Sequence, residues 1–268
     1  MFARLTKCFQ SEKQGPTEKE RKYAQFQAIV ARVEKNQPDL VEIDFSGTRL
    51  STELLLQFCR ALKQNQHVRK LNISNSEVTV DVARLLADAK ITTLIASNCH
   101  INDDVMREIA RSSSLQYLDI SANYLTDRGV ELLSCNRHIT DLILDFNSPG
   151  LGDAVVKLAT MNQLIRLSLA ADGVKDDHLG LLIMLPFLET LCLGGSDIHL
   201  DPLKRVLMQP SGTGSLSLKF LSLPCTNICS SYDQQDIQAT FPKISFLFEK
   251  SKQHTILPAV LHGLSAKL

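Results

Sequence analysis

Apolar and polar positions recur along this chain in a fixed order. The stretch from Leu115 to Leu125 reads apolar, two residues, apolar, one residue, apolar, two residues, small polar, one residue, apolar. The order is found eight times, and successive copies begin 28, 23, 24, 24, 25, 24 and 30 residues apart. Self-similarity at such a period indicates a protein built from stacked repeats. The copies begin at Leu40, Val68, Ile91, Leu115, Ile139, Leu164, Leu188 and Leu218.

Each copy predicts a strand, a turn and a helix. Leu118 and Ile120 are two positions apart, the spacing that points side chains to the same face of a strand. The small polar residue Asn123 follows where the chain must turn, and buried peptide groups of a turn need hydrogen-bond partners, so we expect a structural role for it. Asp127 then precedes a stretch with helical spacing, and Asp is a favoured helix N-cap. Such a unit cannot bury its own apolar face, so its stability must come from stacking.

The pattern resembles that of the leucine-rich repeat family over roughly residues 39–230. The resemblance implies an α/β solenoid, with a curved parallel sheet on the concave side, helices on the convex side and a helical N-terminal cap. It divides the chain into an N-terminal flanking and capping helix at residues 1–38, about eight repeats at residues 39–232 and a C-terminal cap at residues 233–268. The steps near 24 residues are similar to the compact repeats of bacterial members, including Legionella-type effectors.

The two ends of the array need covers, because a terminal coil exposes its apolar face. Residues 17–37 predict an amphipathic helix, and Thr17 with Glu20 forms a capping-box signature at its start. At the other end, residues 241–250 predict a degenerate last strand and residues 255–264 a closing turn or helix. The stripe expected to cover the first coil is Tyr23, Phe26, Ile29, Val30 and Val33.

Composition narrows the class of partner. Lys and Arg number 29, as do Asp and Glu, so the chain lacks the excess of positive charge that nucleic acid or an anionic membrane attracts. No apolar run approaches the ~18 residues of a membrane helix. Seven scattered cysteines indicate reduced thiols in a cytosol-type compartment. We therefore expect a cytoplasmic protein, or one secreted into a host cell cytosol, with no nucleic acid partner, no membrane span and a monomeric state.

The residues show no catalytic set. Nucleophile-elbow, P-loop, HExxH and paired CxxC motifs are all missing, and the histidines are dispersed over different repeats. Cys225 and Cys229 are four apart without a Cys or His pair at zinc-ligand spacing around them. The expectation is a protein that is not an enzyme and that has no cofactor, no metal and no catalytic residue.

The concave face is the expected contact surface, because the side chains between the buried apolar positions of each strand point outward there. Ile95, Tyr117 and Ile143 are expected to offer exposed apolar area beside a carboxylate trio, and aromatic residues with adjacent charges are typical of binding hot spots. The carboxylates favour a partner surface rich in Lys or Arg. The full set of predicted contact residues is Ile95, Tyr117, Asp119, Asp141, Ile143, Asp145, Arg166 and Phe220.

Two functions fit this surface. The first is a non-enzymatic scaffold that recognises another protein through its concave face; the resemblance implies that it could be a bacterial effector that blocks or modulates an enzyme. The alternative is a substrate-recruiting adaptor within a larger assembly such as a ubiquitin ligase, which would need a docking segment outside the repeats. Only residues 1–38 or 231–268 could supply that segment.

Overall fold

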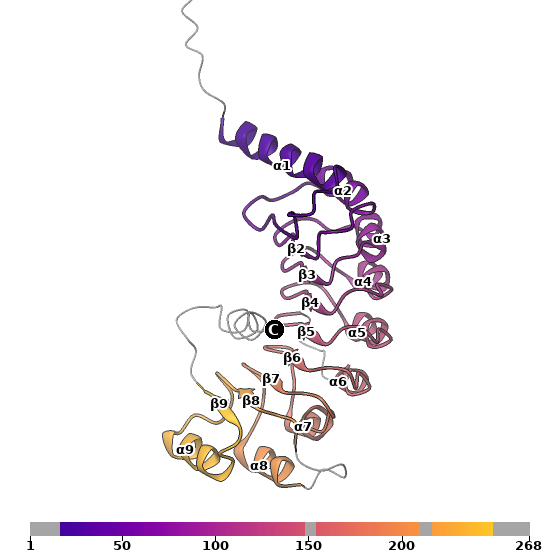
Figure 1. Cartoon of the computed structure of the whole chain (residues 1–268). Coiled ribbons are helices and arrows are strands. Elements are labelled where there is room, and N and C mark those ends of the chain that lie inside the picture. The colour runs from indigo at the N-terminus through magenta and orange to yellow at the C-terminus, as the bar shows by residue number, and fades with distance from the viewer. Residues whose placement is uncertain (1–16, 148–153, 210–215, 249–268) are drawn as a thin grey trace, which may run out of the picture.

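The strands of the protein lie side by side in one parallel sheet, each paired with the next along the chain. The computed structural model describes residues 17–147, 154–209 and 216–248, and in these the sheet has nine strands in sequence order. Figure 1 shows the sheet lining the inner side of an arc, with one helix per unit along the outer side. The predicted solenoid with a concave sheet and convex helices is confirmed.

The elements are short and regular. The strands are β1 (Glu42–Asp44), β2 (Lys70–Asn72), β3 (Thr93–Ile95), β4 (Tyr117–Asp119), β5 (Asp141–Ile143), β6 (Arg166–Ser168), β7 (Thr190–Cys192), β8 (Phe220–Ser222) and β9 (Ser245–Leu247). The helices are α1 (Glu18–Glu34), α2 (Thr52–Leu62), α3 (Val80–Asp88), α4 (Asp103–Ile109), α5 (Asp127–Ser134), α6 (Val155–Leu158), α7 (Asp176–Ile183), α8 (Leu200–Met208) and α9 (Ser231–Thr240).

The middle residue of each strand anchors the core. Leu118 pairs in register with Leu94 on one side and Leu142 on the other, and all three are fully buried. Burying a side chain of this size contributes about 1.5–3 kcal/mol. Because every repeat places the same residue type at the same height, a continuous apolar row runs through the array, and each coil is stabilised by its two neighbours.

The small polar position forms a hydrogen-bond ladder between coils. The side-chain oxygen of Asn123 accepts from the backbone N–H groups of Cys99 and Ile101, both at 2.9 Å. Its amide group donates to the carbonyl oxygens of Ala96 and Ile120, also at 2.9 Å. Asn123 thus satisfies peptide groups of its own repeat and of the preceding one, which confirms its predicted structural role.

The helix starts differ from the prediction by one residue. Asn102 and Thr126 are the N-caps of α4 and α5, and their side chains accept from Val105 N–H and Arg128 N–H. Asp103 and Asp127 are instead the first helical residues, where a negative charge still favours the helix dipole. The prediction of Asp as the N-cap is therefore wrong at these starts, because the extended backbone that caps the helix occurs one residue earlier.

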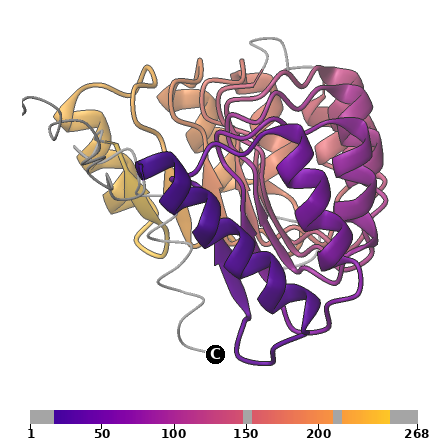
Figure 2. The same ribbon diagram turned by 90° about the horizontal axis from the view of Figure 1, so that it is seen from above.

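Helix α1 covers the first coil, as predicted. Its capping box is present, with Thr17 accepting from Glu20 N–H and the Glu20 side chain accepting from Thr17 N–H. Phe26 is buried 5.7 Å from the ring of Phe45, so the helix is fixed to the first repeat by aromatic packing. Figure 2 shows α1, in dark indigo, lying across the end of the array. Tyr23, expected in the buried stripe, is 54% exposed because it lies at the open start of the helix.

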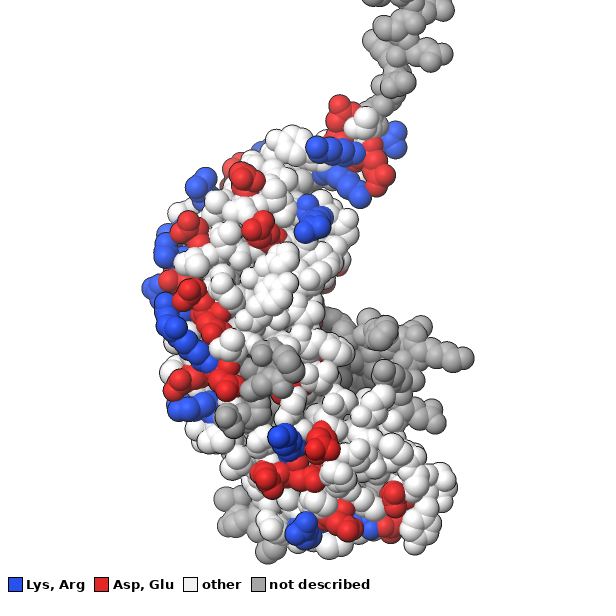
Figure 3. Space-filling model, turned by 180° about the vertical axis from the view of Figure 1, so that it is seen from behind, with Lys and Arg blue, Asp and Glu red and all other residues white. Residues whose placement is uncertain are grey.

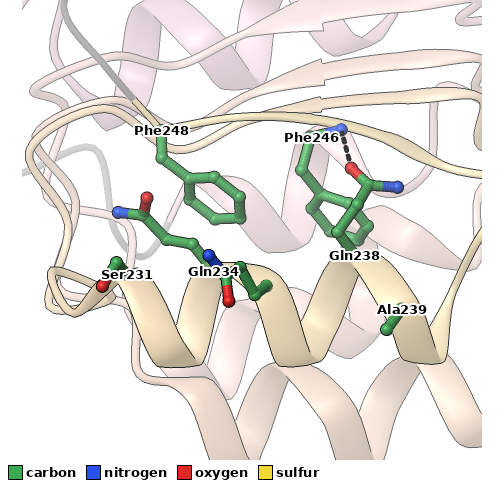
Figure 4. A pocket seen from close by; sticks show the side chains of 7 residues that line it. Ser231, Gln234, Gln238, Ala239, Phe246 and Phe248 are labelled. Atoms are coloured by element: carbon green, nitrogen blue, oxygen red, sulfur yellow. Dashed lines mark hydrogen bonds between the residues drawn. The ribbon is translucent and has the colours of Figure 1, made fainter.

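The C-terminal end of the array is a ninth unit. Strand β9 lies within the predicted cap region and inside the expected degenerate strand, while helix α9 begins two residues before that region, at Ser231. Between them is a pocket of about 510 Å³, where the rings of Phe246 and Phe248 lie over α9 and Phe246 N–H donates to Gln238 at 3.3 Å (Figure 4). The predicted closing element at residues 255–264 lies outside the described residues.

Candidate protein-binding surface

Three rows of side chains cross the concave face, and each row takes one residue from each of the units of β1–β8. The alternation of a strand makes the residues on either side of the buried central residue point to the same, inner face. The first row is Glu42, Lys70, Thr93, Tyr117, Asp141, Arg166, Thr190 and Phe220. The second row is Asp44, Asn72, Ile95, Asp119, Ile143, Ser168, Cys192 and Ser222. The third row, directly after the last apolar residue, is Ser46, Ser74, Ser97, Ser121, Asp145, Ala170, Gly194 and Pro224.

An ion pair occupies the centre of the first row. The guanidinium of Arg166 donates through Nε to Asp141, and Thr140 donates its hydroxyl to the other carboxylate oxygen at 2.7 Å. The Asp141 side chain is 7% exposed and that of Arg166 23% exposed. A charged pair this far from water is weak evidence for stability, but removing one partner would leave a buried charge. Asp141 is therefore engaged within the protein and is not free to attract a cation.

The carboxylate of Asp119, in the second row, is held by two serines. Ser121 donates from its backbone N–H at 3.0 Å and from its hydroxyl at 2.6 Å, and Ser97 donates its hydroxyl at 3.1 Å. All three bonds reach the same oxygen, Oδ1. Such bonds orient the carboxylate without neutralising it, and among the described residues Asp119 has no ion-pair partner.

Asp145, in the third row, is a second carboxylate without a cation. It accepts from the Ser168 hydroxyl and from Ala170 N–H at 2.8 Å, and it too has no ion-pair partner in the described parts of the chain. Burial raises the pKa of Asp145 to about 6, and the charge of nearby Asp119 adds to the increase. Two carboxylates in one poorly solvated place repel each other, so a cation brought between them would be bound favourably.

The structure places the eight predicted contact residues in the three rows, within the units of β3–β8. The exposure of some of their side chains differs from the expectation. Ile95, Tyr117, Arg166 and Phe220 are half-buried, and so is Asp145. The expected exposure is wrong for Asp119, Asp141 and Ile143, which are buried. Arg166 covers Asp141 and the serines enclose Asp119, while Ile143 lies between Asp119 and Ser168 in the middle of its row. Whether these residues contact a partner stays a prediction.

Sequence reasoning missed an aromatic group on the turns next to this face. Tyr124 is 64% exposed and stacks on His100 with ring centroids 5.8 Å apart, and Phe146 is 61% exposed. Phe146 has a φ of 59°, which bulky residues rarely adopt. The signal was present in the sequence, because the residues directly before and after the ladder position are polar or small in most other repeats.

Charged residues gather elsewhere. Figure 3 shows Lys, Arg, Asp and Glu interleaved along the outer, helical edge, while the flank beside it is largely uncharged. Some of these opposite charges form surface ion pairs, such as Lys157 with Glu131 at 3.0 Å. Ion pairs this exposed contribute little to stability. The convex side therefore has no extended field of one sign.

Two features of the described residues bear on catalysis and a third on membrane association. No group of three or more His, Cys, Asp or Glu residues in them could hold a metal ion. Burial raises the pKa of the Cys59 thiol to about 12 and that of Cys99 to about 11, so neither supplies a thiolate nucleophile near neutral pH. Within the same residues, no helix is long and apolar enough to cross a membrane.

The fold is a leucine-rich repeat solenoid, and one of its units matches a family model. A family model described as Leucine Rich repeat matches residues 111–134, the unit that includes β4 and α5. Leiomodin-3 of Homo sapiens is 28% identical over 116 residues, which are 41% of this chain and 17% of leiomodin-3, and leiomodin-3 of Mus musculus gives the same values. The chain thus matches less than a fifth of the length of these curated relatives.

Two solved structures align with parts of the chain. "Leiomodin-1 Actin-Binding Site 2 (ABS2)" aligns with a TM-score of 0.35 and 17% identity, covering 57% of this chain and 79% of that one. The TLR13–ssRNA13 complex aligns with a TM-score of 0.48 and 16% identity, covering 72% of this chain and 30% of that one. At these TM-scores neither likeness bears on what this chain binds.

Proposed function

We propose that this protein is a non-enzymatic recognition scaffold that binds another protein through the centre of its concave face. The observation that carries the proposal is the pair of oriented carboxylates, Asp119 and Asp145, which have no ion-pair partner among the described residues. Half-buried Tyr117 beside them supplies apolar area. The matching partner surface carries a Lys or Arg next to an apolar side chain, because a cation is attracted to two desolvated carboxylates. The role as a bacterial effector that modulates an enzyme stays a prediction.

The proposal is tested with the double variant Asp119→Asn/Asp145→Asn. A partner is first captured from the native host with the immobilised protein and identified, and its affinity is then measured by titration calorimetry. Loss of a charge-assisted contact costs about 2–5 kcal/mol, so the affinity should fall at least about tenfold. The matched control is Asp177→Asn/Asp201→Asn, which removes two exposed carboxylates from the convex helices α7 and α8. Equal affinity of the two double variants for the partner would reject the concave site.

A second candidate is the adaptor function, and a groove at the N-terminal cap favours it. A pocket of about 610 Å³ lies between α1 and the first coil, where Tyr23, Phe26 and Leu50 meet Lys19 and Lys22. An adaptor that docks into an assembly through this end should lose that assembly on Tyr23→Ala, while its concave face keeps its own partner. Co-precipitation of both proteins with the variant distinguishes the two functions: retention of every interaction would remove the support for a docking end.

A further inference from the structure

The first two turns of α1 are helical although they are not packed against the core. Residues 18–25 are all exposed, whereas Phe26 and Val30 further along the helix are buried. In Figure 1 the start of α1 reaches away from α2, beside which α1 ends. A free helix end of this length tends to fray, and here the capping box and the ion pair of Lys22 with Glu18, at 2.9 Å, hold it. The protein therefore maintains an exposed helical end that its core does not stabilise.

A groove of about 610 Å³ lies between this exposed end and the first repeat. Its apolar lining consists of Phe26, Leu50, half-buried Leu54 and Tyr23. The volume falls within the ~300–1,000 Å³ that is usual for ligand sites. Tyr23 is 54% exposed, so more than half of its surface is open to a second molecule. An open aromatic side chain beside apolar area is a frequent anchor of protein interfaces.

The charged residues of the groove are mainly cations. Lys19, Lys22 and Arg49 line it together with one acidic residue, Glu18. Because Glu18 pairs with Lys22, its charge is already matched within the helix. Lys19 and Arg49 are exposed and have no ion-pair partner among the described residues. Charge complementarity therefore favours an occupant that carries carboxylates next to its apolar side chains.

Charge and shape together favour a partner protein as the occupant. The two ends of the chain, residues 1–16 and 249–268, each carry three Lys or Arg against one Glu, so neither complements the cations of the groove. Small-molecule sites bury ~70–90% of their ligand, and a site beside a side chain as exposed as Tyr23 is too open for that. An open groove along a helix instead suits the helix-in-groove mode of peptide recognition, in which apolar residues three or four positions apart are the anchors.

We propose that the groove between α1 and the first repeat binds a short helical segment of a partner protein, in which carboxylates alternate with apolar residues. The inference rests on the adaptor function given above as the second candidate, and it names the chemistry of the docking partner. The apolar side chains of the segment pack on Tyr23 and Leu54, and its carboxylates pair with Lys19 and Arg49. Because the groove lies at the end of the array, this partner leaves the concave face free for another protein.

Selection from a displayed library of random peptides tests the chemistry of the occupant. The library is first depleted on the immobilised full-length variant Tyr23→Ser and then panned against the full-length wild-type protein, so that the retained peptides depend on the groove. We expect these peptides to be rich in Asp and Glu, with Leu, Ile or Phe three or four positions apart. Retained peptides that are mainly basic, or a selection that retains no peptide dependent on Tyr23, would overturn the proposal.

Two variants of the full-length protein then separate the apolar contact from the charged one. The affinity of a selected, fluorescently labelled peptide is measured by anisotropy. Tyr23→Ser should raise its Kd at least about tenfold, as loss of an aromatic anchor does. Lys19→Gln/Arg49→Gln should raise the Kd about fivefold and make binding less sensitive to salt, because it removes two exposed charge contacts. Both variants keep the pair of Glu18 with Lys22, so α1 should stay folded, and circular dichroism checks this.

The matched controls change the same residue types at other exposed places. Tyr232→Ser removes a tyrosine that is 75% exposed on α9, and Arg128→Gln/Lys243→Gln removes one exposed Arg and one exposed Lys. Neither control should change the Kd of the peptide. A Kd that rises as much in the controls as in the groove variants would show that the peptide responds to general surface charge or surface tyrosine, and the proposal would be wrong.

The failure of this inference can be told apart from the failure of the adaptor function. Acidic peptides that bind the groove, while Tyr23→Ala keeps every interaction in the co-precipitation, would support the docking chemistry and reject the adaptor role. Loss of an assembly in Tyr23→Ala, with selected peptides that are not acidic, would keep the docking end and reject the carboxylate partner. Self-association of the wild-type protein in sedimentation experiments that Tyr23→Ser abolishes would assign the groove to a second copy and also overturn the inference.

Discussion

Asp172 stands where the hydrogen-bond ladder requires a donor, and replacing it with Asn should stabilise the protein. The amide groups of Asn123 and Asn147 donate to carbonyl oxygens of their own and the preceding repeat. At the same position in the next repeat, Asp172 is fully buried and accepts from Asn147 N–H at 2.9 Å. Its second oxygen, Oδ2, has no hydrogen-bond partner among the described residues. A carboxylate cannot donate there, whereas a protonated carboxyl group or an amide can.

The size of the effect follows from the pKa of Asp172. Burial raises it to about 8, against the bond from Asn147, and the charge of Asp145 adds to the increase. Because the folded state holds a proton that the unfolded chain releases near pH 4, stability falls as pH rises and levels off above pH 8. Integrated from about pH 6.5 to 9, the loss is about 2 kcal/mol in the free energy of unfolding. Asp172→Asn removes this loss, so its advantage over the wild-type protein should grow by about 2 kcal/mol across that range.

The assay is urea unfolding followed by circular dichroism at several pH values between about 6.5 and 9, with the free energy extrapolated to zero denaturant. Asp145→Asn is the matched control, because the pKa of Asp145 is raised only to about 6. Its difference from the wild-type protein should change by well under about 1 kcal/mol over the same range. A pH-independent difference for Asp172→Asn, or a variant less stable than the wild-type protein at the alkaline end, would refute the reasoning.

Three further substitutions separate core, turn and face. Leu142→Asp buries an unpaired carboxylate in the apolar row and should cost more than about 4 kcal/mol, with loss of the circular dichroism signal. Phe146→Asn relieves a left-handed backbone that Asn tolerates and should raise the midpoint of urea unfolding, a gain of about 1 kcal/mol. Arg166→Ala should cost about 2–3 kcal/mol by leaving Asp141 charged and unpaired, and Asp141→Asn should recover most of that loss. A double-mutant cycle without coupling between Arg166 and Asp141 would contradict the ion-pair assignment.

The fold could be predicted because every coil of the stack must bury the same apolar positions against its neighbours. The three apolar positions of each strand unit, such as Leu115, Leu118 and Ile120, can be buried only against the same positions of the neighbouring coils, so their spacing alone fixes strand and register. The ladder position follows for the same reason, since every buried turn has the same peptide groups to satisfy. The first residue of a helix could be predicted only to within one position. Asn102 and the following Asp103 are both acceptable N-caps, and the sequence does not show which of the two has the extended backbone of a cap.

The candidate site could be predicted only in part, because exposure on the concave face depends on side chains from other repeats. Alternation shows that Asp141 points inward to that face, but its burial is caused by Arg166, 25 residues later in the chain. The hydrogen bonds of Asp119 likewise come from Ser97 in the preceding repeat and Ser121 in its own. The sequence therefore identified which residues share the surface, while their ionisation and access to solvent required the three-dimensional arrangement.

Binding to the concave face should depend on pH, because Asp145 is one of the two carboxylates of the face that have no ion-pair partner among the described residues. Asp145 and Asp119 are both negatively charged at neutral pH, and Asp145 gains a proton as pH falls through its pKa of about 6. Protonation removes one of the two unpaired charges that a basic group would contact, so binding of the partner should weaken in that range. Asp145→Asn should remove this fall in partner affinity between about pH 7 and 5. A pH dependence that persists unchanged in Asp145→Asn would show that the carboxylate does not face the bound cation.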